Sequence, residues 1–366
     1  MSPMRFSLSA SILLAASCVA KWGNDASASS ALAEPETVEI ERVVLAMGTT
    51  LHLKVSAPDR RIALSSSEAA LKAMETVTER LSTWIDDSEL QRLNHLPVGR
   101  SMQLSGALLE DLRKARFWQR KTGGAFDPGI GALVDLYQLR STGRWPSDQE
   151  VWSCLPHSTM SELQVIHSNA RRMSAKLRLE EGGFAKGAGL DAAADAVLKA
   201  GATSVTFDFG GQTLCVGAAA NPTEFQVADP ADRAQPVVSV LVDRGSLATT
   251  GNSERRIQVG DAALGHILDP RTGRPASDFG SVTVWTETAF AADCLSTGLF
   301  VMGPDAALAF AEETPGLEIL VLQTSTDTAS SQTASSQTAS SQTTTARMTS
   351  GMRRRVTALS PGVVLK

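Results

Sequence analysis

Two oxygen-bearing side chains share one face of a helix that is otherwise apolar. Asp293 and Thr297 are four residues apart in FAADCLSTGLFVMG, residues 290–303, and this spacing places them on the same side of an α-helix. A carboxylate buried without a partner costs on the order of several kcal/mol. Carboxylate and hydroxyl oxygens suit Mg²⁺, which keeps waters and shares phosphate oxygens, so the pair suggests a magnesium site. The structural alternative has Asp293 bonded to a neighbouring loop and Thr297 to its own helix.

A pair of glycines and a lysine precede a second helix, in EEGGFAKGAGLD, residues 180–191. Gly182 and Gly183 permit close backbone approach, and Lys186 stands where the helix begins. Free N–H groups at a helix start, together with a lysine, can bind an anion. The stretch lacks the GK[ST] ending of a phosphate-binding loop, and a glycine turn before an ordinary helix with a solvated lysine explains it as well.

A histidine lies at the end of a short strand, in GHILDPRTGRPA, residues 265–276. Asp269 could orient the ring of His266, or cap the tight turn that follows. His266 is therefore a candidate base, and a structural histidine is the alternative. The other four histidines lie in surface-like contexts.

Glycine-rich turns follow three further segments. GGAFDPGIGALVDLYQL, residues 123–139, places Phe126 where it could belong to the core or line a flat ligand. FDFGGQTLCVG and SLATTGN have turn residues after strands. Each turn could approach a ligand closely, and each could be a simple hairpin.

Helices and strands that would position these residues alternate irregularly, which favours an α+β fold over a doubly wound parallel sheet. Residues 36–57 predict two strands joined at Met47-Gly48-Thr49. Residues 65–85 predict a helix capped by Ser66 or Ser67. Further helices are expected at 105–122, 185–201 and 307–316, and a hairpin or two short strands at 161–183.

Composition places the chain among globular proteins. It has 366 residues, of which 43% are hydrophobic and 20% charged, so it can bury a large core in one large or two typical domains. The net charge of -5 argues against nucleic-acid binding, which needs a basic face. Cys154, Cys215 and Cys294 show no metal-binding spacing, and a disulfide at Cys154 stays open.

The N-terminal segment and one internal insert are expected to lie outside the fold. Residues 1–20 have an Arg and a short apolar stretch typical of a secretory signal peptide. LLAASC, ending at Cys18, resembles a lipobox, with Ala15 in place of the preferred Leu; simple cleavage is the alternative. Residues 21–37 predict a linker. Three TASSQ copies predict a disordered insert at about 324–346, followed by a return strand.

Eight motifs occur in an order that closely resembles the ApbE family. The resemblance covers about residues 38–323 and resumes after the insert, which makes 38–366 one domain. The motifs are AMGTT, LSTWIDDSELQRLN, GGAFDPGIGALVDLY, GGFAKGAGLD, FDFGGQTLCVG, SLATTGN, HILDPRTGRP and SVTVWTETAFAADCLSTGLFVMG.

This resemblance implies an ApbE-like fold of mixed and antiparallel sheets with flanking helices and the cofactor in a central cleft. It also implies a Mg²⁺-dependent FAD:protein FMN transferase of the bacterial periplasm. Such an enzyme splits FAD, places FMN on a Thr of a target protein and releases AMP. The implied acceptor is a flavoprotein subunit of a membrane redox complex (Rnf- or Nqr-like), and a lipid anchor would hold the enzyme at the inner membrane.

The resemblance also assigns roles to individual residues. The implied metal ligands are Asp293, Thr297 and the main chain of Gly183, and the implied catalytic residues are His266, Asp293 and Lys186. The implied FAD-binding residues are Met47, Trp84, Ala125, Phe126, Asp127, Glu180, Lys186 and Ile267.

Some positions depart from the family pattern, and two other functions stay open. Trp84 replaces a Tyr, Glu180 an Asp, Gln212 an acidic residue, Thr250 a Ser and Ser253 an aromatic residue. An FAD pyrophosphatase that gives FMN and AMP would use the same residues with water as acceptor. A non-catalytic periplasmic flavin-binding protein is the alternative of another class.

Overall fold

The computed structural model of the chain describes residues 37–217, 222–254, 256–326 and 342–366. The predicted signal peptide at 1–20, the lipobox at Cys18 and the linker up to residue 36 lie outside these residues. None of the described helices has both the length and the apolar character needed to cross a bilayer.

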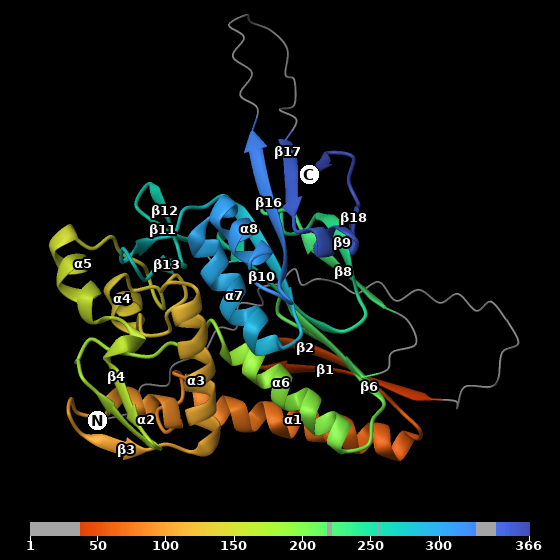
Figure 1. The fold of residues 1–366 in the computed structure, drawn as a ribbon, viewed down its shortest axis with the longest axis horizontal. Helices are drawn as coiled ribbons and strands as arrows, with labels where there is room; N and C mark the ends of the chain where they lie inside the picture. The colour runs from red at the N-terminus through yellow and green to blue at the C-terminus, as the bar shows by residue number, and fades with distance from the viewer. Residues whose placement is uncertain (1–36, 218–221, 255, 327–341) are drawn as a thin grey trace, which may run out of the picture.

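A nine-stranded sheet runs through the described part of the chain (Figure 1). Neighbouring strands of the sheet pair antiparallel, except that β17 and β19 pair parallel. In spatial order its strands are β1 (Val38–Ala46), β2 (Thr49–Ala57), β6 (Ser204–Phe209), β7 (Gln212–Gly217), β10 (Gly245–Gly251), β15 (Gly280–Thr286), β16 (Glu318–Thr326), β17 (Gln342–Met348) and β19 (Val363–Leu365).

Four helices cover one face of this sheet: α1 (Arg60–Leu81), α6 (Ala185–Lys199), α7 (Ala289–Met302) and α8 (Pro304–Glu312). The alternation of apolar residues in β2 and β6 turns Leu51, Leu53 and Phe207 toward α1 and α6. Their burial fixes the register of these strands, because a slip of one residue would expose every apolar side chain.

The opposite face is covered in part by a three-stranded sheet. It contains β8 (Thr223–Ala228), β9 (Pro236–Val242) and β18 (Val356–Ala358), and its valines pack with Leu247, Trp285 and Leu320 of the large sheet. The short helix α9 (Ser350–Arg353) links β17 to this layer.

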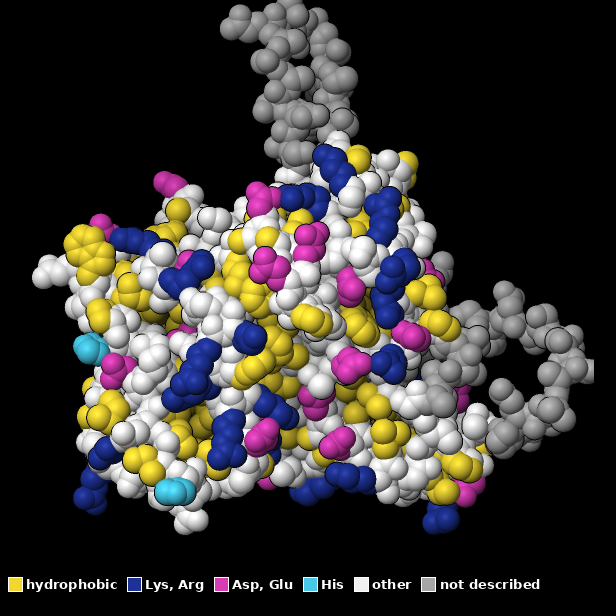
Figure 2. All heavy atoms as spheres, in the orientation of Figure 1, with side chains coloured by type: hydrophobic (Ala, Val, Ile, Leu, Met, Phe, Trp, Pro, Cys, Tyr) yellow, Lys and Arg dark blue, Asp and Glu magenta, His cyan; other side chains and the backbone are white. Residues whose placement is uncertain are grey.

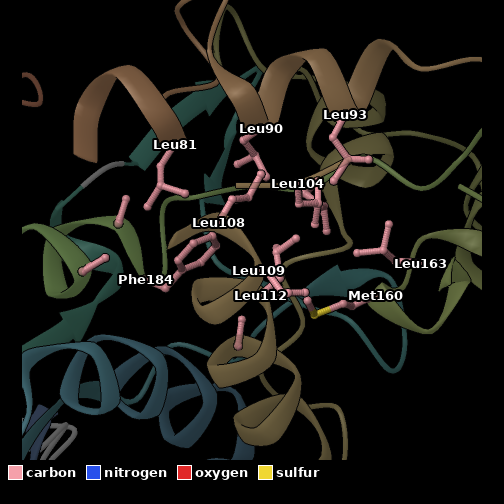
Figure 3. Close-up of a cluster of buried hydrophobic side chains, with 14 of the residues drawn as sticks. Leu81, Leu90, Leu93, Leu104, Leu108, Leu109, Leu112, Met160, Leu163 and Phe184 are labelled. Carbon is pink, nitrogen blue, oxygen red and sulfur yellow. The ribbon is translucent and has the colours of Figure 1, made fainter. Parts of the chain in front are cut away.

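A second layer of smaller elements packs beyond α6 and α7. Figure 3 shows its leucines, from the end of α1 and from α2 and α3, converging with Met160, Leu163 and Phe184. Its elements are α2 (Glu89–His95), β3 (Ser101–Gln103), α3 (Gly106–Lys121), α4 (Gly131–Leu136), α5 (Asp148–Cys154), β4 (Leu163–Ile166) and β5 (Asn169–Arg172). Two short hairpins complete the described fold: β11 (Arg256–Val259) with β12 (Ala262–Gly265), and β13 (Leu268–Asp269) with β14 (Arg274–Pro275).

The strand and helix predictions are confirmed with one clear error. The turn between β1 and β2 lies at Met47-Gly48, as expected, and 163–172 form the expected hairpin. The cap of α1 is wrong: Asp59 caps the helix by accepting from the N–H of Ile62, while Ser66 and Ser67 are buried inside it. The apolar pattern does not mark this helix start, because RRIAL at 60–64 already follows the helical period.

The boundaries of the predicted insert are also corrected. Residues 324–326 extend β16 and residues 342–346 belong to β17, so both ends of the segment are paired strand. The remainder of the predicted insert, 327–341, lies outside the described residues. Cys154, Cys215 and Cys294 are free and buried, so the disulfide considered for Cys154 is absent.

Candidate active site

The N-termini of α6 and α7 cross so closely that each is capped by a carboxylate from the other. Asp191 of α6 accepts the N–H groups of Ala289 and Phe290 at 2.7 and 3.0 Å. Asp293 of α7 accepts the N–H of Gly187 at 2.9 Å. The helix dipoles favour a negative charge at the N-terminus of each of the two helices. A Cβ on Gly187 would lie 2.3 Å from the carbonyl oxygen of Ala289, so only glycine fits this crossing.

Asp293 and Thr297 lie together where this crossing meets the loop before α6. Asp293 is 3% exposed, and its Oδ1 lies 3.5 Å from Nζ of Lys186. The hydroxyl of Thr297 makes only a long bond of 3.4 Å to the carbonyl of Asp293. The structural alternative is therefore borne out in part: Thr297 bonds back to its own helix, and Asp293 bonds a backbone N–H, although in the neighbouring helix and not in a loop.

Gly183 lies against the same hydroxyl. A Cβ added to it would be 3.4 Å from Oγ1 of Thr297 and 3.1 Å from the ring of Phe126. Phe126 also packs on Gly298, the next residue of α7. The two glycines thus let the turn at 123–128, the loop at 181–184 and α7 meet with main chain close to Asp293 and Thr297.

The side chains of Ala125, Phe126 and Asp127 are buried, which favours the core alternative for the Phe126 ring. Phe126 is 3% exposed, and Ala125 packs with Ile267 and α7. The cofactor contact that the resemblance implies for this turn stays a prediction.

Asp127 is a structural hub. Its carboxylate accepts from Gly129 N, Met160 N, Gln119 and Thr159, at 2.6 to 3.1 Å. Burial raises the pKa of Asp127, and these bonds oppose the rise.

Met47 occupies the tip of the β1–β2 hairpin. Its φ of 42°, followed by 76° at Gly48, gives the twist that suits a two-residue hairpin, although such a φ is uncommon for methionine. Its methyl group would lie 3.1 Å from a Cβ on Gly189, three residues after Lys186. The structure therefore brings the predicted Met47 to α6, near the candidate metal ligands.

Arg140 contacts both Trp84 and Glu180, and the sequence alone did not identify it as a site residue. The guanidinium of Arg140 lies 4.8 Å from the centre of the Trp84 ring, and its Nη2 lies 2.6 Å from Oε2 of Glu180. Burial raises the pKa of Glu180 to about 7, and Arg140 opposes that rise.

His266 and Ile267 lie between β12 and β13. Ile267 is buried against Ala125 and Leu295, so this segment packs on α7 beside the 123–128 turn. The carboxylate of Asp269, expected to orient His266, accepts three bonds from Arg271, two of them at its Oδ1, and its main chain closes the turn. Asp269 therefore serves the turn, and a further role toward His266 stays a prediction.

Two of the departures from the family pattern support α7. Gln212 donates to the carbonyl of Ala289 at 2.7 Å, at the start of the helix. Thr250 donates to Ser296 at 2.9 Å, next to Thr297. These side chains tie β7 and β10 to the helix that carries the candidate metal ligands.

Two surface hollows lie away from the predicted site residues. One, of about 630 Å³, lies between α4 and α5, and the other, of about 470 Å³, lies over α3. Neither is lined by a predicted site residue. Within the described ranges no cluster of three His, Cys, Asp or Glu could hold a metal by itself.

Comparison with known proteins identifies relatives of this fold. The model of the ApbE family matches residues 47–321. The FAD:protein FMN transferase of Vibrio cholerae is 27% identical over 286 residues, 76% of this chain and 86% of that protein. The FAD:protein FMN transferase of Treponema pallidum is 29% identical over 311 residues, 78% of this chain and 84% of that protein.

Solved structures show the same likeness. The ApbE protein from Thermotoga maritima superposes with a TM-score of 0.72 at 27% identity, covering 77% of this chain and 94% of that one. The flavin transferase ApbE from Vibrio cholerae gives 0.67 at 25% identity, covering 79% and 94%. The prediction of an α+β fold of this type is confirmed.

Proposed function

The chain belongs to the ApbE family, and we propose on that premise that it is an FAD:protein FMN transferase. It moves FMN from FAD to a Thr hydroxyl of a target flavoprotein and releases AMP. The observation that carries the proposal is the meeting of Asp293, Thr297, Gly183 and Lys186 at the crossing of α6 and α7.

Mg²⁺ fits the residues at this crossing. Among the described residues, the Oδ1 of Asp293 and the hydroxyl of Thr297 have only long contacts, 3.5 and 3.4 Å, so both oxygens are available to a cation. The main chain of Gly183 lies beside that hydroxyl and would supply a carbonyl. All three are hard oxygen donors, which Mg²⁺ prefers, and too few to enclose it without water or phosphate.

Mg²⁺, when bound, supplies positive charge that offsets the charge developing on the diphosphate oxygens. The other steps belong to the chain. Lys186, exposed enough to reach a substrate, adds a second positive charge. The acceptor Thr oxygen bonds to the phosphorus on the FMN side, the bond from that phosphorus to the AMP oxygen breaks, and the Thr proton passes to His266. Such base assistance contributes roughly 10²–10⁴-fold.

The proposal includes a location and a partner. The predicted signal peptide at 1–20 and the likeness of LLAASC, ending at Cys18, to a lipobox support a periplasmic protein held at the inner membrane as a lipoprotein. An acceptor subunit of a Rnf- or Nqr-like redox complex would lie at the same membrane.

One incubation tests the function. The protein is mixed with FAD, Mg²⁺ and a candidate acceptor protein, and the acceptor is examined for flavin fluorescence after denaturing electrophoresis. Fluorescent acceptor supports transfer. Free FMN and AMP without labelled acceptor support a pyrophosphatase, and intact FAD supports a flavin-binding protein. Asp293→Ala should abolish Mg²⁺-dependent turnover, and a variant that transfers FMN normally would refute the metal assignment.

A further inference from the structure

Arg140 joins three segments that are far apart in the sequence. It follows α4, in the turn at 137–143, and reaches the segment after α1 and the segment before α6. Its Nη2 donates to Oγ1 of Thr83 at 2.5 Å and to Oε2 of Glu180 at 2.6 Å. The guanidinium of Arg140 also lies over the ring of Trp84, with its central carbon 4.8 Å from the ring centre.

The indole of Trp84 is fixed on one face and open on the other. Trp84 is 68% exposed, although a large apolar ring gains by burial. The stacked guanidinium restrains the ring, and the neighbouring Thr83 is anchored by Glu181 through bonds of 2.6 and 3.1 Å. An exposed ring with a guanidinium over one face offers its other face to another planar group.

Both the main chain and the side chain of Glu180 are held by hydrogen bonds. Its N–H donates to the carbonyl of Pro128, next to Asp127, and its carboxylate pairs with Arg140 through Oε2. Among the described residues no hydrogen bond reaches its Oε1, which lies against α4 because a Cβ on Gly131 would approach it to 2.9 Å. That oxygen keeps its capacity to accept a hydrogen bond, and the Glu180 side chain is 19% exposed.

We propose that Arg140 is a positioning residue that presents the Trp84 ring and the Glu180 carboxylate together to one planar ring of the bound dinucleotide. The inference rests on the proposed function for the identity of that dinucleotide, FAD. The ring stacks on the open face of Trp84, and a hydrogen-bond donor on the same half of the molecule reaches Oε1 of Glu180. Arg140 touches neither the ring nor the phosphates and acts through its two neighbours.

Arg140→Met tests the role, with Arg144→Met as the matched control. Arg144 also forms a 2.6 Å ion pair, with Glu150, but away from Trp84 and Glu180. Loss of the stacked charge and its charge-assisted bond should raise the KM and the Kd for FAD about 10-fold, with kcat changed less than about threefold. Arg140→Lys keeps the charge without the plane and should recover roughly half of that loss. Arg144→Met should leave all three constants unchanged.

A double variant shows whether Arg140 acts through Trp84. In a Trp84→Ala background, Arg140→Met should weaken FAD binding by a clearly smaller factor than in the wild type, because interacting residues are not additive. Equal FAD affinity of Arg140→Met and Arg144→Met would overturn the proposal. So would a fall in kcat with KM unchanged. Thermal unfolding checks that each variant is folded. If Arg140→Met does not fold, the FAD affinity of Arg140→Lys is compared with that of Arg144→Met instead.

Separate ligands identify the ring. FMN and ADP are titrated calorimetrically against the wild type and Arg140→Met. Weaker FMN binding with unchanged ADP binding assigns the flavin ring to Trp84, and the reverse assigns the adenine. No change with either ligand refutes the stacking role. FAD binding is measured apart from turnover, so a protein that binds FAD through Arg140 and transfers nothing would contradict the proposed function alone.

Discussion

Asp191→Ala should destabilise the protein strongly, although this residue lies outside every site predicted from the sequence. The change leaves the N–H groups of Ala289 and Phe290 without their acceptor, after bonds of 2.7 and 3.0 Å. Each buried donor left unpaired costs about 1–3 kcal/mol, and the lost charge at the start of α7 costs about 0.3–1 kcal/mol more.

Two effects reduce that cost. Burial raises the pKa of Asp191, so its removal also removes an unfavourable desolvation. Water can reach the part-buried N–H groups once the side chain is shortened. A net loss of about 2–4 kcal/mol in the free energy of unfolding is therefore expected.

Urea unfolding at neutral pH measures the loss, with Asp195→Ala as the control. Asp195 lies four residues further along α6, is exposed, and forms only a 3.9 Å pair with Lys199. Its removal should change the free energy of unfolding by less than about 0.5 kcal/mol. The reasoning on reciprocal caps fails if the two variants unfold at the same urea concentration.

Three further predictions concern the sheet, the helix crossing and the metal ligands. Burial raises the pKa of Asp208 to about 7, above its ordinary 3.8, so the stability of the wild type should fall as pH rises between these values. Asp208→Asn should therefore be more stable than the wild type by about 2–4 kcal/mol at pH 8 and by much less at pH 4.5. A stability difference that does not change with pH would contradict this. Gly187→Ala should cost at least about 1–3 kcal/mol in urea unfolding, because its Cβ would lie 2.3 Å from a backbone oxygen; Gly182→Ala, with open space, is the control, and equal stabilities would argue against the tight crossing. Thr297→Val should raise the Mg²⁺ concentration for half-maximal FMN release roughly 10-fold with little change in unfolding, and an unchanged Mg²⁺ titration would remove Thr297 from the ligand set.

Local patterns predicted the elements well because their causes are local. The β1–β2 hairpin follows from alternation around Met47-Gly48, and the shared face of Asp293 and Thr297 follows from helical spacing. The cap of α1 was misplaced because RRIAL continues the apolar period, and only the position of Asp59 in space identifies the start.

Contacts between distant segments could not be read from the chain. Arg140 stands in a polar turn, and its partners Thr83 and Glu180 are 57 and 40 residues away. Asp191 caps a helix 98 residues later. Phe126 could have lined a ligand or the core. Its packing on Gly183 and Gly298, which lie far from it in the sequence, favours the core, and no local pattern encodes that closeness.

The mutual capping of α6 and α7 has a consequence for how the protein folds. Neither helix start is complete until the other is present, and the two partners of each cap are 98 and 106 residues apart. Such long-range contacts close late, because the loop between them must lose its entropy first. The contacts that bring Asp293 to Lys186 therefore belong to the long-range set that closes late, and a local opening at either helix start breaks a cap of the other. A chain in which either helix start is open therefore lacks the contact of Asp293 with the start of α6, where the candidate cation ligands meet Lys186.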